Sequence, residues 1–338
     1  MKTRSIRPAS VALALAALSL TAACGGAGGA DTETDTAGAA VAAPSLDAVE
    51  IIAPAAPGGG WDSTSRAAQA VLESEGIVES SQVTNIAGAG GTIGLAKLAG
   101  MEGEAGTLMT MGLVMVGAIE TNDSAATLDD VTPIARLTSE QEALVVPADS
   151  PYQTMEEFVA AWEKDPGSLP IAGGSAGGTD QIFAGLLAQA AGIDPKEVNY
   201  VAFSGGGEAL AAILGGKVAA GISGVSEFKD QVATGKMRAL AVSGAEPVEG
   251  FDAPTAQEAG LDVELDNWRG FVAPAGISDA DKEALTTAVE KMYESQAWKD
   301  QLAKNGWDDA YLPADEFAEY LTEEEVRISE VLADLGLV

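Results

Sequence analysis

The sequence has no histidine and a single cysteine, Cys24, among its 338 residues. Without histidine there can be no Ser-His-Asp triad, no imidazole acid–base group and no histidine ligand for a metal. One cysteine cannot form an internal disulfide. Paired carboxylates of the glycosidase type are compatible with 51 acidic residues, but no pattern singles out such a pair. We therefore expect a binding protein and not an enzyme, with no metal site and no cofactor.

Basic residues are also scarce. Lysine and arginine number 18 against 51 aspartate and glutamate residues, which gives a formal net charge of −33. A surface of this sign repels nucleic acid and anionic lipid, so we expect no nucleic-acid partner. Net charge says little about one pocket, and we interpret the acidity as an adaptation for solubility or salt.

Long apolar runs are missing too, and the one near the N-terminus is short. Lys2, Arg4 and Arg7 precede an apolar run over residues 11–23. This run is shorter than the roughly 20 residues that a membrane-spanning helix needs. A basic start followed by a short apolar run is typical of a signal peptide, which we assign to residues 1–23.

The end of this run, LTAAC, resembles the lipobox of bacterial lipoproteins. Small residues precede Cys24, although Leu20 stands four residues before it and Thr21 occupies the usual place of the leucine. We expect Cys24 to be lipidated and to hold the protein on the outer face of the cytoplasmic membrane. Residues 24–45 are rich in Gly, Ala, Thr and Asp, which predicts a flexible tether.

Repeated strand, loop and helix units make up the remaining chain. An apolar run at residues 49–53 leads into GGGWD and then into a segment with helical spacing. Residues 81–100, 107–120 and 169–192 repeat parts of this pattern. The repetition predicts an α/β protein of two domains, each a mainly parallel sheet flanked by helices.

Two extended segments, residues 131–151 and 263–276, are expected to be the strands that cross between the domains. They place one domain at residues 46–140 plus 267–338 and the other at residues 141–266. The amphipathic helices after the second crossing are expected to return to the first domain. Charge runs in the last helix, such as EEE at residues 323–325, are interpreted as solvent-facing.

Glycine-rich loops recur where the predicted strands end and helices begin. In open α/β sheets ligands bind at such strand ends, and the first N–H groups of a helix attract anions. A single loop of this kind is more often an ordinary turn, and Asp62 and Asp180 are most simply helix N-caps. Several such loops in two domains predict a joint anion site. They are residues 58–63, 85–92, 173–180, 203–207 and 223–226.

Nucleotide motifs are incomplete. GAGGTIG has Ile93 where a dinucleotide fingerprint needs its third glycine, and GGGWDS lacks the GK[ST] ending of a P-loop. Both patterns argue against nucleotide binding in an exported chain.

Six segments, taken in order, resemble the receptors of tripartite tricarboxylate transporters. They are PAAPGGGWDSTSRA, NIAGAGGTIGLA, IAGGSAGGTDQIFAGLLAQAAG, YVAFSGGGEALAAILGGKV, MRALAVSGAE and NWRGFVAPAG. The resemblance runs from about Val49 to the C-terminus, and GGGWD with NWRG is most similar to the citrate-type receptors. It implies the two-domain type II periplasmic-binding-protein fold, in which the domains close over a carboxylate.

The resemblance also implies a set of ligand-binding residues. Arg269 would supply a bidentate grip on a carboxylate, or would instead pair with one of the many acids. A tryptophan such as Trp61 or Trp268 would serve the site or only pack. The expected ligand-binding residues are Gly59, Gly60, Trp61, Asp62, Ser63, Asn85, Thr92, Ser175, Gly177, Gly178, Thr179, Phe203, Ser204, Gly205 and Arg269.

Together these features predict a monomeric solute-binding protein that captures a small organic carboxylate, with citrate and related tricarboxylates first. By the resemblance it would deliver this ligand to a large and a small membrane subunit. The alternative is a carboxylate-sensing receptor that docks on a signalling partner.

Overall fold

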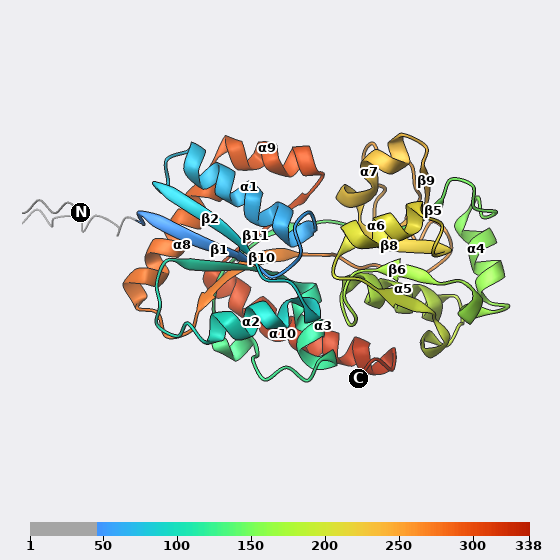
Figure 1. Ribbon diagram of the computed structural model, residues 1–338, viewed down its shortest axis with the longest axis horizontal. Coiled ribbons are helices and arrows are strands. Elements are labelled where there is room, and N and C mark those ends of the chain that lie inside the picture. The colour runs from blue at the N-terminus through green and yellow to red at the C-terminus, as the bar shows by residue number, and fades with distance from the viewer. Residues whose placement is uncertain (1–45) are drawn as a thin grey trace, which may run out of the picture. The chain divides into compact units, whose positions relative to one another are not determined.

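Two α/β lobes, each built on its own sheet, are seen in the computed structural model, which describes residues 46–338 (Figure 1). The predicted signal peptide, the lipidation site Cys24 and the tether lie outside the described residues. Within residues 46–338, no helix combines the length and apolar character that crossing a membrane requires.

The first lobe contains a six-stranded sheet in the order β11-β4-β10-β3-β1-β2. Strand β1 pairs in parallel with β2 and β3, whereas β10 runs antiparallel to β3 and β4, and β11 antiparallel to β4. The strands are β1 (Ala48–Ala53), β2 (Ser80–Asn85), β3 (Thr107–Gly112), β4 (Val131–Ser139), β10 (Arg269–Pro274) and β11 (Asp308–Pro313).

The second lobe contains a five-stranded sheet in the order β7-β6-β8-β5-β9. Strand β6 is parallel to β7 and β8, and β5 is antiparallel to β8 and β9. The strands are β5 (Glu142–Pro147), β6 (Ile171–Gly173), β7 (Tyr200–Ala202), β8 (Ala220–Gly224) and β9 (Met237–Val242).

Both sheets are therefore mixed, although the sequence predicted mainly parallel ones. The strand, helix, strand units give parallel pairs, as expected for crossover connections. The chain leaves the first sheet through β4, enters the second through β5 and re-enters the first through β10, and these three strands run antiparallel to their neighbours. The two-domain α/β fold itself is confirmed.

Helices cover both faces of each sheet (Figure 1). In the first lobe α1, α8 and α9 pack on one face and α2, α3 and α10 on the other; in the second, α6 and α7 lie opposite α4 and α5. The helices are α1 (Gly60–Ser74), α2 (Thr92–Ala99), α3 (Leu113–Thr121), α4 (Met155–Trp162), α5 (Thr179–Ala190), α6 (Gly206–Leu214), α7 (Val225–Ala233), α8 (Asp279–Glu294), α9 (Gln296–Asn305) and α10 (Ala314–Asp334), with short 3₁₀ turns at Ala89–Gly91, Leu128–Asp130, Pro166–Ser168 and Pro195–Glu197.

Two hydrogen-bonded crossing segments join the lobes. The first leads from β4 to β5 and the second leads into β10. The Glu140 N–H donates to the Asn267 carbonyl at 3.1 Å, and the Asn267 N–H donates back to the Glu140 carbonyl at 3.0 Å. This pairing lies between the two sheets. We propose the same domain boundaries as those expected from the sequence.

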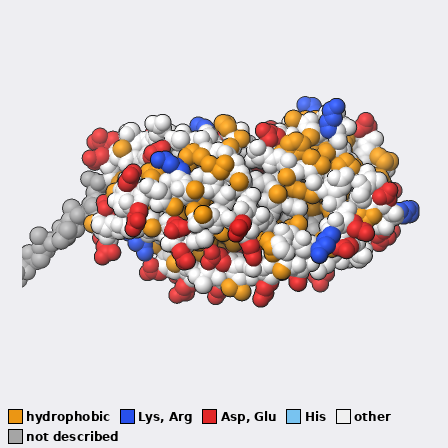
Figure 2. Space-filling model, turned by 60° about the horizontal axis from the view of Figure 1, so that its bottom comes forward, with side chains coloured by type: hydrophobic (Ala, Val, Ile, Leu, Met, Phe, Trp, Pro, Cys, Tyr) orange, Lys and Arg blue, Asp and Glu red, His pale blue; other side chains and the backbone are white. Residues whose placement is uncertain are grey.

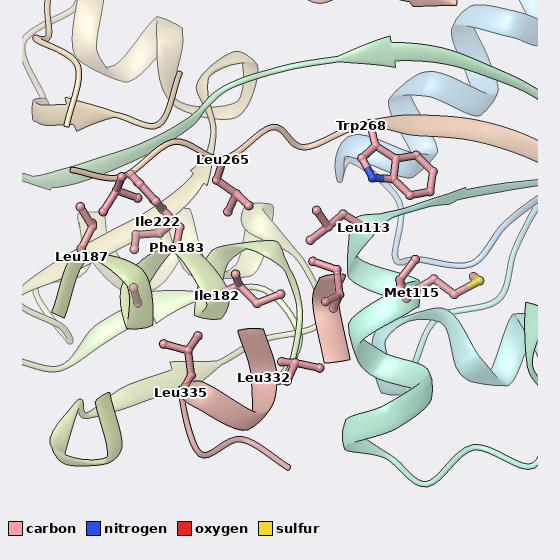
Figure 3. Close-up of a cluster of buried hydrophobic side chains, with 14 of the residues drawn as sticks. Leu113, Met115, Ile182, Phe183, Leu187, Ile222, Leu265, Trp268, Leu332 and Leu335 are labelled. Atoms are coloured by element: carbon pink, nitrogen blue, oxygen red, sulfur yellow. The ribbon is translucent and has the colours of Figure 1, made fainter. Parts of the chain in front are cut away.

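Helix α10 packs on both lobes, which is more than the expected return to the first domain. Its buried Phe317 and Leu321 belong to the first lobe's side of the core. At its far end Leu332 and Leu335 join Ile182 of α5 in the same hydrophobic cluster (Figure 3). The C-terminus of the chain therefore links the lobes in addition to the two crossings.

The same helix corrects one expectation about its charge run. Glu324 is only 4% exposed, although the sequence suggested a solvent-facing run. Its Oε2 accepts a hydrogen bond from Trp268 Nε1 at 2.9 Å, and Arg327 pairs with it from the next turn. A buried indole N–H needs an acceptor, and Glu324 supplies it.

Candidate functional site

A cavity of about 70 Å³ lies between the lobes. A cavity needs at least about 10–15 Å³ of such volume to hold one water, so this cavity has room for more than one. Both lobes and one crossing segment contribute to its wall. The lining residues are Pro54, Ala55, Gly59, Gly60, Trp61, Gly88, Gly90, Gly91, Val114, Gly174, Ser175, Gly178, Asp180, Ser204, Gly205, Gly206, Ser223, Glu227, Asn267 and Arg269.

Besides α2, whose N-cap Gly91 also lines the cavity, three helices begin there, and each has a glycine as its N-cap. Gly59 precedes α1, Gly178 precedes α5 and Gly205 precedes α6, and none of the three helices has a side-chain cap hydrogen bond. Amide groups in a first helical turn have no intrahelical acceptor and carry partial positive charge. The cavity therefore receives the positive ends of helices from both lobes.

Close packing explains why glycine begins two of these helices. A Cβ at Gly60 would come within 2.5 Å of the Arg269 guanidinium. At Gly206 a Cβ would overlap the Glu227 carboxyl group and the Ser223 hydroxyl. The main chain at these two positions thus leaves space for charged side chains.

Arg269, at the start of β10, contributes a guanidinium group to the cavity lining, and the residue is 3% exposed. Its Nη1 lies 2.6 Å from Glu140 Oε2, and the guanidinium carbon lies 5.7 Å from the Trp307 ring centroid. Ser226 Oγ donates to the other Glu140 oxygen at 3.0 Å. Burial opposes the charge of Arg269, but the Glu140 carboxylate raises its pKa. Arg269 therefore pairs with an acid and also lines the cavity, and its grip on a ligand carboxylate stays a prediction.

Three further carboxyl groups surround this ion pair. Asp180 Oδ2 accepts from the Gly174 N–H at 2.6 Å, Glu142 Oε1 accepts from Asn267 Nδ2 at 2.6 Å, and Glu227 Oε1 accepts from the Gly60 N–H at 3.1 Å. The bond to Gly60 joins α7 of the second lobe to α1 of the first.

Burial and mutual repulsion shift these acids toward the un-ionised form. Burial raises the pKa of Asp180 to about 6 and, with the nearby charges of Glu140 and Asp180, that of Glu227 to about 8. Burial also raises the pKa of Glu142 well above its usual range. Like charges in a low-dielectric site disfavour ionisation, so the cluster binds protons at neutral pH.

Eight of the expected ligand-binding residues line this cavity, and they come from both lobes. They are Gly59, Gly60, Trp61, Ser175, Gly178, Ser204, Gly205 and Arg269. The structure thus brings together residues as far apart in the chain as Gly59 and Arg269.

The other expected residues lie outside the lining. Asp62 bonds Gly58 N–H, Arg66 and Asn85; burial opposes its charge, but these bonds lower its pKa. Thr92 Oγ1 donates to the Ala89 carbonyl at 2.9 Å. Phe203 lines a neighbouring hollow that shares Ser175 and Ser204 with the cavity. The residues outside the cavity lining are Asp62, Ser63, Asn85, Thr92, Gly177, Thr179 and Phe203.

Several groups at the cavity were not among the expected ligand-binding residues. Glu227 follows the predicted loop at residues 223–226, and Asp180 ends the predicted loop at residues 173–180, where a helix N-cap was its simplest interpretation. Asn267 in the lining and Glu140 beside it lie in the crossings. The predicted crossings were the one available signal for Glu140 and Asn267, because segments between two domains border any cleft between them. Within the described residues, no group of three or more His, Cys, Asp and Glu side chains is placed to hold a metal ion.

Comparison with known proteins gives similarity over most of the chain. Residues 66–337 match the family described as tripartite tricarboxylate transporter family receptor. Protein BugT of Bordetella pertussis is 25% identical over 298 residues, which cover 85% of this chain and 89% of that one. The UPF0065 protein in the gbd 5′ region of Cupriavidus necator is 27% identical over 62% of this chain, and the match spans 63% of that relative's length.

Solved structures agree in fold. MatC from Rhodopseudomonas palustris with bound malate has a TM-score of 0.76 at 26% identity, covering 85% of this chain and 99% of that one. The periplasmic binding protein BugD has a TM-score of 0.78 at 19% identity, covering 86% and 98%, which supports the fold alone. From the family match over most of its length, together with the two-lobed fold, we conclude that the chain belongs to the tripartite tricarboxylate transporter receptor family.

Proposed function

We propose that this chain is an extracytoplasmic solute-binding protein that captures a small organic carboxylate between its lobes. The observation that carries this proposal is the cavity, where three helix N-termini with glycine caps converge from both lobes. Aligned amides and partial positive charge at helix starts are suited to a carboxylate. Two solved relatives of similar fold carry malate and adipate.

The charge of the cavity bears on which acid is bound. One guanidinium, already paired with Glu140, stands among four carboxyl groups. A trianion would add three negative charges to this cluster, at a large electrostatic cost in a low-dielectric site. We therefore place mono- and dicarboxylates ahead of citrate, although citrate-type ligands came first from the sequence.

Delivery and anchoring complete the proposal. We propose that lipidated Cys24 holds the protein on the outer face of the cytoplasmic membrane, and that a large and a small membrane subunit receive the ligand. Membership of the transporter receptor family supports this over the alternative, a sensor that docks on a signalling protein. Genes for two multi-spanning membrane proteins beside this one would favour transport.

Two measurements test carboxylate binding. Mass spectrometry of ligand released from natively purified protein should detect a small organic acid, and calorimetry should give its affinity. Ser175→Ala should weaken this binding about tenfold or more, because a hydrogen bond to a charged acceptor contributes about 1.5–3 kcal/mol. Ser80→Ala, at an exposed serine of β2, is the control and should bind normally. If the Ser175 variant and the wild type bind with equal affinity, the Ser175 loop does not contribute to ligand binding.

A further inference from the structure

Glu227 lies in the first turn of α7 and reaches the opposite lobe. Its Oε1 accepts the Gly60 N–H, at the start of α1, where a ligand carboxylate would otherwise bind. Its Oε2 has no hydrogen-bond partner within the described residues and less than 1 Å² of accessible surface. The Glu227 side chain lines the cavity, and its Oε2 lies with the Ser223 hydroxyl against Gly206, which begins α6 and also lines the cavity.

The groups that face Glu227 leave it without a cation of its own. Glu140 between β4 and β5, Glu142 on β5 and Asp180 on α5 are acids, and the guanidinium of Arg269 is bonded to Glu140. With one positive and four negative groups, the cluster would have a net charge of 1 − 4 = −3 if every group were ionised. Such a charge in a buried site is strongly unfavourable, so protons must bind to part of the cluster.

Among these acids, Glu227 is the one best placed to hold a proton for the ligand. Both oxygens of Glu140 are already bonded, one to Arg269 and one to Ser226, and Asp180 accepts a short bond from the Gly174 N–H. Glu142 bonds Asn267 and is not part of the cavity lining. Glu227 has one oxygen accepting an amide and the other unpartnered, which is the arrangement of a carboxylic acid ready to donate.

We propose that Glu227 stands un-ionised in the cavity and donates its Oε2–H to a carboxylate of the ligand. The inference rests on the proposed function. An O–H···O⁻ bond of this kind is short and about twice as strong as a neutral one. It would recognise an anionic end of the ligand, whereas an ammonium group would require an ionised Glu227.

Binding should then depend on pH in a defined direction. Glu227 has its pKa raised to about 8, and a bound anion beside it would raise this further. Below about pH 8 the free protein already carries this proton, so any change in affinity there comes from Asp180, which lines the cavity with a pKa of about 6 and is the same in wild type and Glu227 variants. As pH rises above about 8, affinity should fall by up to tenfold per pH unit, because binding must then take up a proton.

Glu227→Gln gives the decisive comparison, since its amide keeps a donor and cannot ionise. Calorimetry with malate and with adipate from pH 6 to pH 10 should show wild-type affinity falling above about pH 8 and the variant binding at every pH without this fall. Glu264→Gln, an exposed residue of the same lobe, should follow the wild type. Equal pH profiles in wild type and Glu227→Gln, or loss of binding in Glu227→Gln with the fold intact, would overturn the proposal.

Infrared spectroscopy of ligand-free protein separates this inference from the proposed function. Un-ionised carboxyl bands from both Glu142 and Glu227 should be present at pH 7. The Glu227 band should fade above about pH 8 and should be missing from Glu227→Gln, whereas the Glu142 band should remain in the variant. If neither acid binds at any pH, carboxylate capture is in doubt while the band still reports the proton on Glu227. If wild type and Glu227→Gln have identical carboxyl bands, Glu227 is ionised and the proposal fails.

Discussion

At the scale of single residues, Gly206 and Gly207 begin α6 side by side but differ in the space around them. A Cβ at Gly206 would overlap Glu227 and Ser223, whereas a Cβ at Gly207 meets nothing within 4 Å. Neither glycine needs a left-handed backbone. The difference between them is therefore steric and directed at the cavity.

Gly206→Ala should weaken carboxylate binding about tenfold or more, because Glu227 and Ser223 must move away from the helix start. Gly207→Ala should leave affinity unchanged and raise the free energy of unfolding by up to about 1 kcal/mol, since alanine loses less backbone entropy than glycine in a helix. Calorimetry and denaturant unfolding measure the two effects. Unaltered affinity in the Gly206 variant would mean that Glu227 is not held where binding takes place.

These residues also mark what sequence could and could not predict. Glycine N-caps at strand ends form a local pattern, so Gly59, Gly178 and Gly205 were expected at the site, and they line the cavity. The hydrogen bond between Gly60 and Glu227 joins residues 167 apart. A glutamate in the first turn of a helix is ordinary, because the helix dipole favours it there. Only the approach of the two lobes distinguishes Glu227 from other such glutamates.

At the scale of elements, α10 likewise makes tertiary contacts that its sequence pattern does not predict. Its amphipathic pattern predicted a helix with one buried face, and the helix is present. The pattern could not show that this face contacts two lobes in succession. Glu324 was grouped with solvent-facing acids because its partner, Trp268, is 56 residues earlier in the chain. Tertiary contacts of this kind are not encoded in local periodicity.

Leu335→Ala should destabilise the protein by about 2–5 kcal/mol, because it removes a buried leucine and leaves a cavity against α5. Leu335 is 1% exposed, and its side chain occupies the space beside Gly185. The control is Val338→Ala, three residues on and 53% exposed, which should change stability by no more than about 0.5 kcal/mol. Denaturant unfolding measures both. Similar unfolding midpoints for the two variants would show that the C-terminal contact with α5 contributes little.

At the scale of the whole molecule, acidic residues have two separate roles. Most are scattered over the surface, where few lysine or arginine side chains accompany them (Figure 2). Four others, Glu140, Glu142, Asp180 and Glu227, surround the buried Arg269. The surface charge favours solubility, whereas the buried cluster sets the chemistry of the cavity. Net charge alone predicts the first role and is silent on the second.

We expect the lobes to move apart for ligand entry. The Gly60–Glu227 hydrogen bond joins the two sides of the cavity and must break for them to separate. Anion-binding helix starts lie on both lobes, so a ligand contacts all of them only when the lobes approach each other. Ligand binding should therefore shift the population toward the closed form. The size of the shift is set by how much more tightly the ligand binds the closed form than the open one.

Tryptophan fluorescence should report this shift through Trp61, which lines the cavity. Trp268 was expected to contribute, but it lies in the core, bonded to Glu324 and packed edge-on against Phe317 and Tyr320. Trp61→Phe should therefore remove most of the ligand-dependent change while retaining binding. Trp268→Phe should retain most of the ligand-dependent fluorescence change. It should also lower the free energy of unfolding, because the hydrogen bond to Glu324 is lost. A signal that survives in Trp61→Phe would locate the change elsewhere.

X-ray scattering tests the closure itself. Protein first shown to be ligand-free should have a larger radius of gyration than the same protein saturated with ligand, because the lobes separate and return about the crossings at Glu140 and Asn267. These crossings pair through two backbone hydrogen bonds between the two sheets, and we expect the rotation to take place there. Helix α10 opposes wide opening, since Leu332 and Leu335 must stay near α5 or lose their buried contacts. The expected change is thus small but measurable, and Leu335→Ala should enlarge it by releasing that contact. Superimposable curves with and without ligand, in both proteins, would mean that the lobes do not close on binding.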